Sequence, residues 1–401
     1  MFHLLAGIKI IDLTTIVLGP YATQILGDFG AEVIKVESTD GDLFRAVRPG
    51  RRPDIGVQFQ NFNRNKQSVA LDLKTPEARE VLYQLVADAD VVVHNMRSRS
   101  AQQLGASFDE LRKHNSQLVY CYAPGFADGG PSQNDPAYDD IIQARSGLAA
   151  LNADADGAPQ FVRSIVCDKV VGLHLAIAVL TGIVHRLKTG TGVCIEAPML
   201  ESMTAFLMSE HLAGHSLVPP EGELGYSRMM SRHRQPYRTR DGYLAILPYS
   251  TRHWTRFFTL CGETTLAEDP RVTNAELRSE HIDELYQEIA RIAPTRSNDE
   301  WLTALKAQDI PCSAVNQLDE LARDPQLVAS GSFETLQDPL LGTLQQLRSP
   351  FRIHDGNTDP TLHQRADRRA PGLGEHTRAT LEQLGLDDGQ IDSLFEAGIV
   401  R

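Results

Sequence analysis

The chain has 401 residues, of which 42% are hydrophobic and 23% are charged, so it is long enough for two or three packing units with sizeable cores. Its formal net charge is −13 at pH 7, which disfavours general attraction to nucleic acid or to an anionic membrane. Neither is therefore an expected partner.

The N-terminal segment 1–13, MFHLLAGIKIIDL, contains the first predicted strand. It has no basic region, long apolar core or small-residue cleavage site, and so does not resemble a signal peptide. The longest apolar run, Val170–Val184, is shorter than the roughly 20 residues that span a bilayer. We interpret this run as a core helix and expect a soluble protein.

Strand and helix patterns alternate over the first 200 residues. In the clearest helix signal, Thr75 can cap a helix whose first position is Pro76. This alternation predicts a parallel sheet covered by helices. The predicted strands are Lys9–Leu13, Glu32–Glu37, Val69–Leu73, Val91–His94, Leu118–Tyr122 and Val193–Ala197. The predicted helices between them are Ala22–Phe29, Pro76–Ala87 and Phe108–His114.

The pattern changes after about residue 200. A long predicted helix, Met199–Ala213, is followed by a linker rich in proline and glycine. Residues 226–325 then indicate a smaller α+β domain inserted in the chain, with a strand at 242–247. Its helices are predicted around residues 252–261, 279–292 and 299–307, and beyond it come a strand-rich stretch, 333–351, and two closing helices, 375–386 and 388–397.

Cysteine and histidine spacing indicates no metal site. The five cysteines lie far apart without any CxxC spacing, which favours neither a disulfide framework nor zinc and predicts a reducing, cytoplasmic setting. His211 and His215 are four residues apart, but the pair lacks the glutamate of HExxH, so a packing or surface role is favoured. The cysteines are Cys121, Cys167, Cys194, Cys261 and Cys312.

Several common catalytic motifs are absent. No GxxxxGK[ST] loop and no GxSxG elbow occurs, which disfavours a Walker-type NTPase and a serine hydrolase. The TGTG segment at 189–192 lacks the third glycine and precedes a strand, whereas a dinucleotide-binding fingerprint follows a strand and opens a helix. A plain turn is the better interpretation, and an NAD-dependent oxidoreductase is disfavoured.

A cluster of arginines interrupts the acidic chain shortly after the linker. One interpretation is a solvated loop; the other is an anionic-ligand pocket, because guanidinium groups match carboxylate and phosphate geometry. Both remain open. The cluster comprises Arg228, Arg232, Arg234, Arg238 and Arg240.

Asp168 stands directly before the apolar run Val170–Val184. A carboxylate at a helix N-terminus is kept ionised by the helix dipole and oriented by free backbone N–H groups. Judged from the residues alone, Asp168 would most simply be a helix N-cap.

Seven segments together resemble the class III CoA-transferases, or CaiB/BaiF type, which include formyl-CoA transferase, carnitine CoA-transferase and α-methylacyl-CoA racemase. The likeness follows the chain in order over almost its whole length. Its segments are Leu5–Leu13, Gly19–Gln24, Gly30–Glu37, Asn65–Lys74, Ala137–Asp139, Asp168 and Leu373–Thr377.

The resemblance implies an α/β fold in which both chain ends form a Rossmann-like large domain. A smaller α+β domain is inserted, and two subunits interlock as a homodimer. The implied divisions are 1–200 for the first part of the large domain, 201–225 for a linker, 226–325 for the small domain and 326–401 for a linker and the rest of the large domain.

The resemblance also implies that Asp168 is the nucleophile of a CoA-transferase. Its attack on an acyl-CoA thioester gives an aspartyl-acyl anhydride and CoA thiolate, and the thiolate then forms an aspartyl-CoA thioester that passes CoA to a free carboxylic acid. Coenzyme A thioester is thus a substrate, and no tightly bound cofactor or metal is expected. Arg163 and the arginine cluster suggest a dicarboxylic acid as acceptor.

Further site residues follow from the resemblance. Those implied to bind CoA are Asn65, Lys66, Asn95, Arg97 and Arg99, and those implied to contact substrate are Ile16, Val17, Tyr138 and Arg234. For Lys66 the alternatives are a phosphate contact or a solvated side chain.

Two departures from the family's sequence pattern narrow the choice of reaction. Val17 replaces a glutamine of formyl-CoA transferase, and Tyr138 replaces a histidine that racemases use as a base. An ordinary tyrosine, with a pKa near 10, is a poor base for racemisation. CoA transfer is therefore preferred over an acyl-CoA racemase or epimerase, and over a non-catalytic acyl-CoA-binding protein.

Overall fold

A computed structural model describes residues 2–353 and 368–401 of the chain. It divides into two compact units, of which unit 1 comprises residues 1–207 and 329–401 and unit 2 comprises residues 208–328. Unit 2 encloses the predicted range 226–325. The predicted last section of the large domain includes residues 354–367, which lie outside the described residues.

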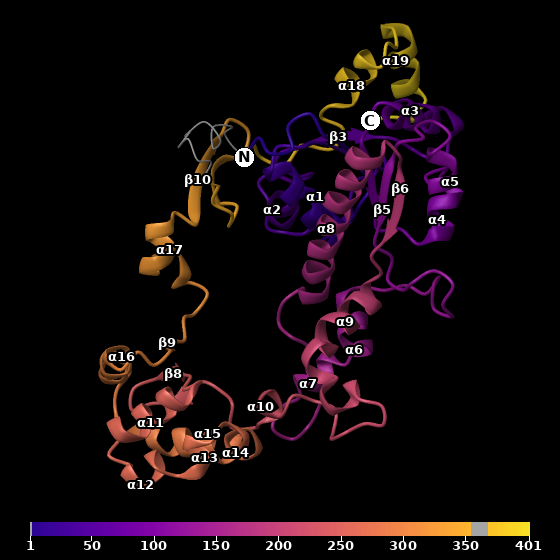
Figure 1. The fold of residues 1–401 in the computed structure, drawn as a ribbon. Helices are drawn as coiled ribbons and strands as arrows, with labels where there is room; N and C mark the ends of the chain where they lie inside the picture. The colour runs from indigo at the N-terminus through magenta and orange to yellow at the C-terminus, as the bar shows by residue number, and fades with distance from the viewer. Residues whose placement is uncertain (1, 354–367) are drawn as a thin grey trace. The chain divides into compact units, whose positions relative to one another are not determined.

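Unit 1 is built on a six-stranded parallel sheet, so the predicted parallel sheet is confirmed (Figure 1). The strand order is β3-β2-β1-β4-β5-β6. In chain order, the strands are β1 (Lys9–Asp12), β2 (Glu32–Glu37), β3 (Lys66–Ala70), β4 (Val91–His94), β5 (Val119–Tyr122) and β6 (Val193–Glu196).

Helices cover both faces of this sheet. Neighbouring strand residues point to opposite sides, so Ile10 joins a core with α1 and α8, whereas Ile11 joins a core with α3, α18 and α19. These helices are α1 (Leu18–Asp28), α8 (Val166–Thr189), α3 (Pro76–Ala87), α18 (Thr377–Gln383) and α19 (Asp388–Glu396). In α3 the predicted cap is present, because the Thr75 side chain accepts from the Ala78 N–H.

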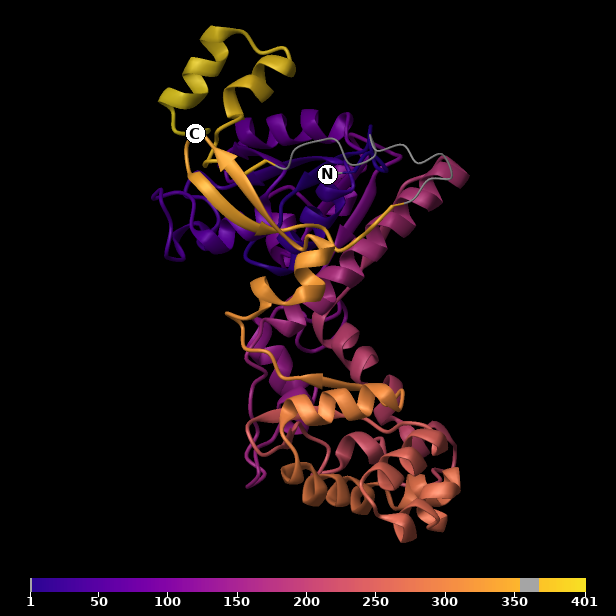
Figure 2. The same cartoon turned by 90° about the vertical axis from the view of Figure 1, so that its left-hand side faces the viewer.

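The C-terminal segment completes unit 1. The backbone N–H of Ala70 in β3 donates to the Thr377 hydroxyl at 3.0 Å, and Leu71 forms a bridge with Val400. The two views show α18 and α19 beside this part of the chain (Figure 1, Figure 2). Unit 1 therefore contains residues from both ends of the sequence.

Shorter elements fill the loops of unit 1. A hairpin of β10 (Phe333–Asp338) and β11 (Gly342–Leu347) carries Leu341, which packs with Ile55 and Phe59. The remaining elements are η1 (Leu43–Ala46), α2 (Val57–Asn63), α4 (Ser98–Gln103), α5 (Phe108–Leu111), α6 (Asp139–Arg145) and α7 (Leu148–Leu151), with α9 (Met199–His211) and α17 (Pro325–Ser330) crossing the boundaries between the units.

Among the described residues, α8 is the one helix long and apolar enough to cross a membrane. One of its faces is a core face: Val171, Leu175 and Val179 are fully buried, against the sheet. This agrees with the interpretation of the apolar run as a core helix. The helix begins at Val166, earlier than the predicted run, and ends at Thr189 before Gly190, which caps it in a left-handed conformation.

Unit 2 has its own core around an antiparallel sheet of order β7-β8-β9. Trp254, Phe257 and Trp301 are buried in it, and Ser297 and Glu300 form a capping box at the start of α16. Its elements are η2 (Ala213–Ser216), α10 (Ser227–Met230), β7 (Tyr237–Arg238), β8 (Tyr243–Ile246), α11 (Thr251–Leu260), α12 (Thr264–Ala267), α13 (Pro270–Thr273), α14 (Ala275–Glu280), α15 (Ile282–Ile292), η3 (Ala293–Thr295), α16 (Asn298–Ala307), β9 (Cys312–Ala314) and η4 (Leu321–Arg323).

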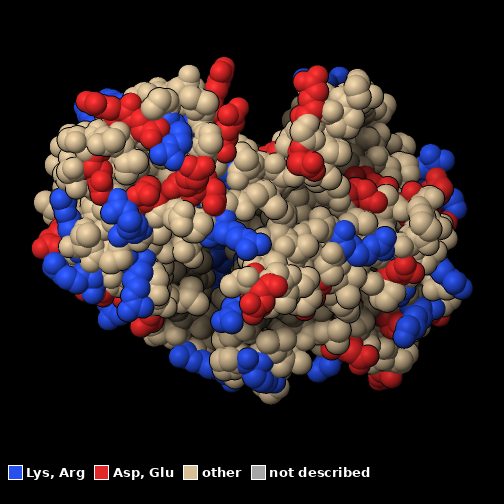
Figure 3. Space-filling view, turned by 90° about the horizontal axis from the view of Figure 1, so that it is seen from below, with Lys and Arg blue, Asp and Glu red and all other residues tan. Residues whose placement is uncertain are grey.

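Charged side chains are mixed on the face drawn in Figure 3, where lysine and arginine are interspersed with aspartate and glutamate. The chain as a whole has 52 acidic and 39 basic residues, so acidic groups are in excess.

Candidate active site

The strand order places a crevice between the loops that follow β1 and β4. These two strands are neighbours, yet the chain runs from β1 to β2 on one side and from β4 to β5 on the other, so the order reverses between them. In open parallel sheets, ligands bind at such a switch point, beyond the carboxyl ends of the strands. Residues that follow β1, β2, β4 and β5 therefore form the expected site.

A cavity of about 330 Å³ occupies this position. Six of the predicted site residues line it: Ile16, Val17, Asn95, Arg97, Tyr138 and Asp168. The other lining residues are Thr15, Leu18, Gly41, Asp42, Leu43, Met96, Ser100, Ala123, Gly125, Asp135, Pro136, Ala137 and Met199.

Asp168 lies in the first turn of α8, and only 7% of it is exposed. The helix begins at Val166 and its N-cap is Ile165, so Asp168 is the third helical residue. The N-cap interpretation of Asp168 is therefore wrong, because the helix begins at Val166, four residues before the apolar run that starts at Val170. Its carboxylate has no hydrogen-bond partner within residues 2–353 and 368–401 and faces the cavity.

Asp139 is the nearest polar partner of Asp168. The backbone N–H of Asp168 donates to Asp139 Oδ1 at 3.0 Å. The second oxygen of Asp139 accepts from Gln143 Nε2 at 2.6 Å, and Gln143 Oε1 accepts the Val162 N–H at 2.8 Å. Asp139 thus connects α6 to the start of α8 and fixes the backbone that carries Asp168.

This setting raises the pKa of Asp168 to about 7, because the carboxyl is buried and the negative charges of Asp139 and Asp140 lie close by. The sequence predicted a carboxylate kept ionised by the helix dipole; burial and the two neighbouring acids oppose that ionisation. A carboxyl with a pKa near neutrality in a cavity is a typical feature of functional sites.

Asn95 and Thr15 join the two loops at the switch point. The Thr15 N–H donates to Asn95 Oδ1 at 2.9 Å, and Asn95 Nδ2 donates to the Thr15 carbonyl at 3.0 Å. The Asn95 amide is thus occupied by the β1 loop, while the residue still lines the cavity. Arg97 lies next to it, exposed, with Nη1 donating to the Asn134 carbonyl at 2.8 Å.

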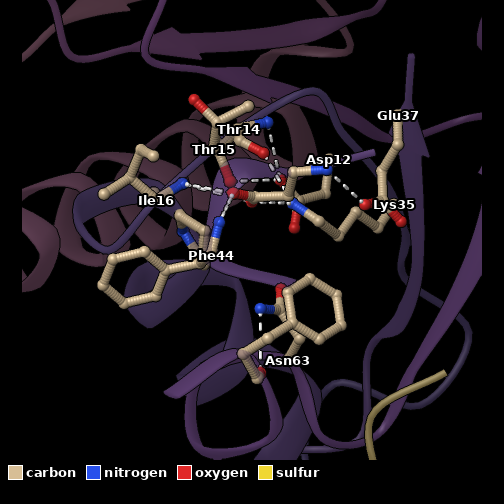
Figure 4. A network of polar contacts seen from close by, with 12 residues as sticks. Asp12, Thr14, Thr15, Ile16, Lys35, Glu37, Phe44 and Asn63 are labelled. Carbon is tan, nitrogen blue, oxygen red and sulfur yellow. Dashed lines mark hydrogen bonds and ion pairs between the residues drawn. The ribbon is translucent and has the colours of Figure 1, made fainter. Parts of the chain in front are cut away.

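Ile16 has a left-handed backbone with a φ of 71°, which is an outlier for a β-branched residue. Its N–H points toward the Asp42 carboxylate, whose oxygens lie 3.1 and 3.2 Å away. The backbone nitrogens of Ile16 and Phe44 converge on the same group (Figure 4). The cavity wall after β1 is therefore held by a residue of the loop after β2.

Lys66 does not line this cavity, and because it is buried, the prediction of a solvated side chain is wrong. It is only 4% exposed, and its ammonium donates to Asp12 Oδ2 at 2.9 Å and to Thr23 Oγ1 at 2.7 Å. Burial alone would raise the pKa of Asp12, but Lys66, Lys35 and the hydroxyls of Thr14 and Thr23 lower it to about 2. Lys66 is thus the counter-ion of the buried Asp12, and its contact with a phosphate of CoA stays a prediction.

Asn65 and Arg99 also lie outside the cavity lining. Asn65 has a φ of 69°, and its amide bonds to Asp28 at 2.9 Å and to the Arg368 N–H at 2.8 Å. These bonds give it a structural role between α1 and the C-terminal segment. Arg99 is exposed on α4.

Arg234 belongs to unit 2, where it is exposed. The arginine cluster is divided between roles: Arg240 pairs with Glu300 at 2.9 Å, whereas Arg228 stacks on Tyr249 and donates to Tyr286 Oη at 2.6 Å. Arg228 also lines a second cavity of about 210 Å³ within unit 2. Arg228 thus lies at a cavity and Arg240 forms an ion pair, and the anionic-ligand interpretation of the cluster stays a prediction.

Sequence reasoning missed the roles of Asp139 and Asp42. Asp139 belonged to a recognised segment without an assigned role, and Asp42 follows a predicted strand at its carboxyl end, a position that favours ligand sites. In the described part of the chain, no group of three histidine, cysteine, aspartate or glutamate side chains could hold a metal ion.

The parallel sheet, the switch-point cavity and its buried carboxyl are typical of an α/β enzyme, and comparison with known proteins gives the family. Residues 5–377 match CoA-transferase family III, and the chain belongs to this family of CoA-transferases.

Relatives cover nearly the whole chain. An acyl-CoA transferase of Fusarium pseudograminearum is 29% identical over 99% of this chain and 88% of its own length. A succinate–glutarate CoA-transferase of Agrobacterium fabrum is 29% identical, over 95% of each chain. Formyl-CoA:oxalate CoA-transferase of Escherichia coli is also 29% identical, over 97% of this chain and 98% of its own.

Solved structures agree with this assignment. A CaiB/BaiF family protein from Brucella suis superposes with a TM-score of 0.78 and 29% identity, covering 96% of this chain and all of its own. The protein Rv3272 from Mycobacterium tuberculosis gives a TM-score of 0.79 and 29% identity, over 94% of this chain and 98% of its own. The chain is thus an enzyme of the CoA-transferase type with a Rossmann-like α/β fold.

Proposed function

We propose that the enzyme moves CoA from an acyl-CoA donor to a free carboxylic acid through covalent intermediates on Asp168. The observation that carries this proposal is the position of the Asp168 carboxyl: it faces the switch-point cavity, and no hydrogen bond from the described residues occupies its oxygens. A nucleophile needs such free lone pairs.

The proposed chemistry balances in four steps. The Asp168 carboxylate attacks the thioester carbonyl, forming an acyl anhydride and releasing CoA thiolate. The thiolate attacks the aspartyl carbonyl, which releases the donor acid and forms an aspartyl-CoA thioester. The acceptor carboxylate attacks this thioester, giving a second anhydride and thiolate. The thiolate then attacks the acceptor carbonyl, so that acceptor acyl-CoA leaves and Asp168 is regenerated as a carboxylate.

The surroundings of Asp168 suit this sequence. The first attack requires the ionised carboxylate of Asp168. Burial of Asp168 limits the access of water, which would hydrolyse the anhydride and the aspartyl thioester. The hydrogen bond from the Asp168 N–H to Asp139 fixes the backbone, so the carboxylate is oriented before substrate arrives.

For the substrate-binding residues, we propose that CoA runs past Asn95 and Arg97, which lie at the cavity, and toward Arg99 on the adjoining helix. Ile16, Val17 and Tyr138 line the part where the acyl group would react. A dicarboxylic acceptor is supported by two relatives whose names contain succinate, glutarate or oxalate.

We further propose that the protein is a homodimer, interlocked as in the family it resembles. The outer face of α8 supports this: Leu173, Ile177, Val184 and Leu187 are exposed, and with half-buried Leu180 they repeat at intervals of four and three residues. That spacing forms a continuous apolar seam, which a second helix can cover. We call these five residues the α8 seam.

A reducing, cytoplasmic compartment remains part of the proposal. All five cysteines are free thiols, and Cys194 is exposed. Persistent free thiols of this kind are usual in reducing compartments.

The mechanism is tested by trapping. Wild-type enzyme is incubated with succinyl-CoA and quenched with hydroxylamine, which converts an aspartyl thioester or anhydride into a hydroxamate; peptide mass spectrometry should find this tag on Asp168. A tag on another residue would contradict the mechanism. In parallel, incubation with a 2-methylacyl-CoA in deuterium oxide should leave the α-carbon undeuterated, and rapid deuterium incorporation would favour a racemase.

A further inference from the structure

The backbone of Ile16 is an unexplained feature of the cavity wall. Left-handed φ values suit glycine, and a β-branched residue adopts them only when the surrounding structure imposes the conformation. Ile16 has a φ of 71° and lines the cavity together with Asp168. Something in the fold must therefore hold it there.

The restraint comes from Asp42. Both of its carboxylate oxygens lie within hydrogen-bond distance of the Ile16 N–H, at 3.2 and 3.1 Å, and Oδ1 also accepts from the Phe44 N–H at 3.0 Å. Figure 4 shows these two labelled nitrogens directed at one carboxylate. A charged acceptor makes a stronger hydrogen bond than a neutral one, which suits a residue that must hold a strained backbone.

Asp42 is itself held by Lys35. Their charged atoms are 3.1 Å apart, and both side chains are fully buried. The same ammonium donates to the Thr14 carbonyl at 2.6 Å, two residues before Ile16. Burial opposes the charge of Lys35, but Asp42, Asp12 and Glu37 raise its pKa, so the ammonium of Lys35 stays charged. The Lys35–Asp42 pair thus ties the β1 loop to the β2 loop at two points.

The restrained loop leads into α1, which contacts α8, the helix that carries Asp168. Val17 precedes α1, and a Cβ on Gly172 of α8 would lie only 2.7 Å from the Leu18 carbonyl. The backbones of α1 and α8 are therefore in close contact one turn beyond Asp168. A change in the Ile16 conformation would shift Leu18 and disturb this contact.

We propose that the Lys35–Asp42 pair is a positioning device for CoA transfer, which holds Ile16 in its left-handed conformation and thereby sets the cavity wall opposite Asp168. Asp42 is a positioning residue and not a second base, because protein donors already occupy its carboxylate. The inference rests on the proposed function of Asp168.

The first test is Asp42→Asn. The amide keeps the size of the side chain but loses the charge that pairs with Lys35. It also keeps only one acceptor oxygen, because an NH₂ group takes the place of the other. We expect kcat to fall by about 100-fold, in line with the effect of a 1 Å misplacement of reacting groups, with little change in KM for the acyl-CoA. Unchanged kcat in a folded Asp42→Asn protein would overturn the proposal.

The second test is suppression by Ile16→Gly. Glycine adopts a left-handed φ without strain, so in the Ile16→Gly background the further change Asp42→Asn should lower kcat by no more than about threefold, an effect small beside the 100-fold loss expected in the native background. Equal losses in both backgrounds would show that Asp42 does not act through Ile16, and would overturn the proposal.

Two controls keep the result interpretable. Asp28→Asn removes a carboxylate from another buried pair, with Arg64, away from the cavity lining; it should lower the melting temperature without changing kcat. If Asp42→Asn fails to fold, the paired change Lys35→Met with Asp42→Leu removes both charges together, which buried pairs often tolerate, and the same comparison is made in the Ile16→Gly background.

Hydroxylamine tagging of wild type on Asp168 separates the two claims: its failure refutes the proposed mechanism, whereas tagging with no Asp42–Ile16 coupling refutes only this inference.

Discussion

Asp139 and Asp168 meet at the start of α8, where the Asp139 carboxylate accepts the backbone N–H of Asp168 at 3.0 Å. The bond orients the backbone of Asp168, while the charge of Asp139 raises the pKa of its side chain. One acidic residue therefore both positions the candidate nucleophile and makes its ionisation less favourable. Activity, stability and pH dependence are expected to be coupled at this pair.

Asp168→Asn separates catalysis from folding. The amide cannot act as the nucleophile, so CoA transfer should fall by at least about 1,000-fold, as expected when a covalent pathway is lost. The measurement is turnover of succinyl-CoA with a free acid, with circular dichroism as the control for folding. A folded variant with near-normal turnover would show that Asp168 is not the nucleophile.

The same variant should be more stable than wild type at neutral pH. The folded pKa of Asp168, about 7, lies above the ordinary value of 3.8, so folded protein binds a proton that the unfolded chain has lost between these values. Wild-type stability should therefore fall as pH rises from about 4 to 7, and the asparagine variant lacks this loss. The melting temperature of Asp168→Asn minus that of wild type should be larger at pH 8 than at pH 4.5. An equal difference at both pH values would contradict the assigned pKa.

On the acidic side of the pH profile, the rise of kcat/KM should reflect the ionisation of Asp168. Because the ionised form attacks, kcat/KM should rise with pH and level off above about 7. Of the two neighbouring carboxylates, Asp139 raises the pKa of Asp168 more, so Asp139→Asn should move the midpoint to lower pH. Asp140→Asn is the matched control: Asp140 is exposed and contributes less, so its removal should move the midpoint less. A midpoint that neither change moves would assign the rise to another group.

Lys66→Met should affect stability more than CoA binding. Removing one partner of a buried ion pair costs about 3–5 kcal/mol when the other charge is left alone; here the remaining charge is Asp12, which keeps Lys35 and the hydroxyls of Thr14 and Thr23, so the loss should lie toward the lower end of this range. Chemical denaturation should show this loss, while KM for the acyl-CoA stays near the wild-type value in whatever folded protein remains. A selective rise in KM without loss of stability would support a role for Lys66 at the phosphates.

Glutamate in the α8 seam should prevent subunit association. Ile177→Glu places a charge within the apolar seam, whereas His185→Glu adds the same side chain to an exposed position of α8 outside the seam. Light scattering should find a monomer for the first variant and a dimer for the second. A monomeric wild type, or a dimeric Ile177→Glu protein, would contradict the proposed interface.

The acceptor hypothesis predicts a difference between acids. If arginines of unit 2 recognise a second carboxylate, Arg234→Gln and Arg238→Gln should raise KM for succinate more than KM for butyrate. Arg240→Gln is the control, because Arg240 already pairs with Glu300. Equal changes for both acids would remove the support for a dicarboxylic acceptor.

The alternating pattern of the first 200 residues was sufficient to predict the parallel sheet and the position of Asp168 near a helix start. Apolar periodicity could not locate where α8 begins, because Val166 and Cys167 precede Asp168 within the same helix. Strand β3 lies three residues before its predicted position: it begins at Lys66, and charged residues rarely open a buried strand.

Long-range polar contacts were beyond sequence reasoning. Lys66 pairs with Asp12, 54 residues away, and Asp168 contacts Asp139, 29 residues away. Each side chain has an ordinary solvated or capping interpretation when read locally, and only the strand order brings the partners together. The resemblance to the family identified residues that line the cavity, as for Ile16, Val17 and Tyr138.

The two hydrogen bonds between Thr15 and Asn95 hold together the loops that follow β1 and β4. These loops cannot separate without breaking both bonds, so this part of the cavity lining is fixed. Leu43 and Tyr138 also line the cavity, and their side chains are largely exposed. We therefore expect the size limit for the acyl group to change when these two exposed side chains are changed, and not when a substrate presses on the fixed loops.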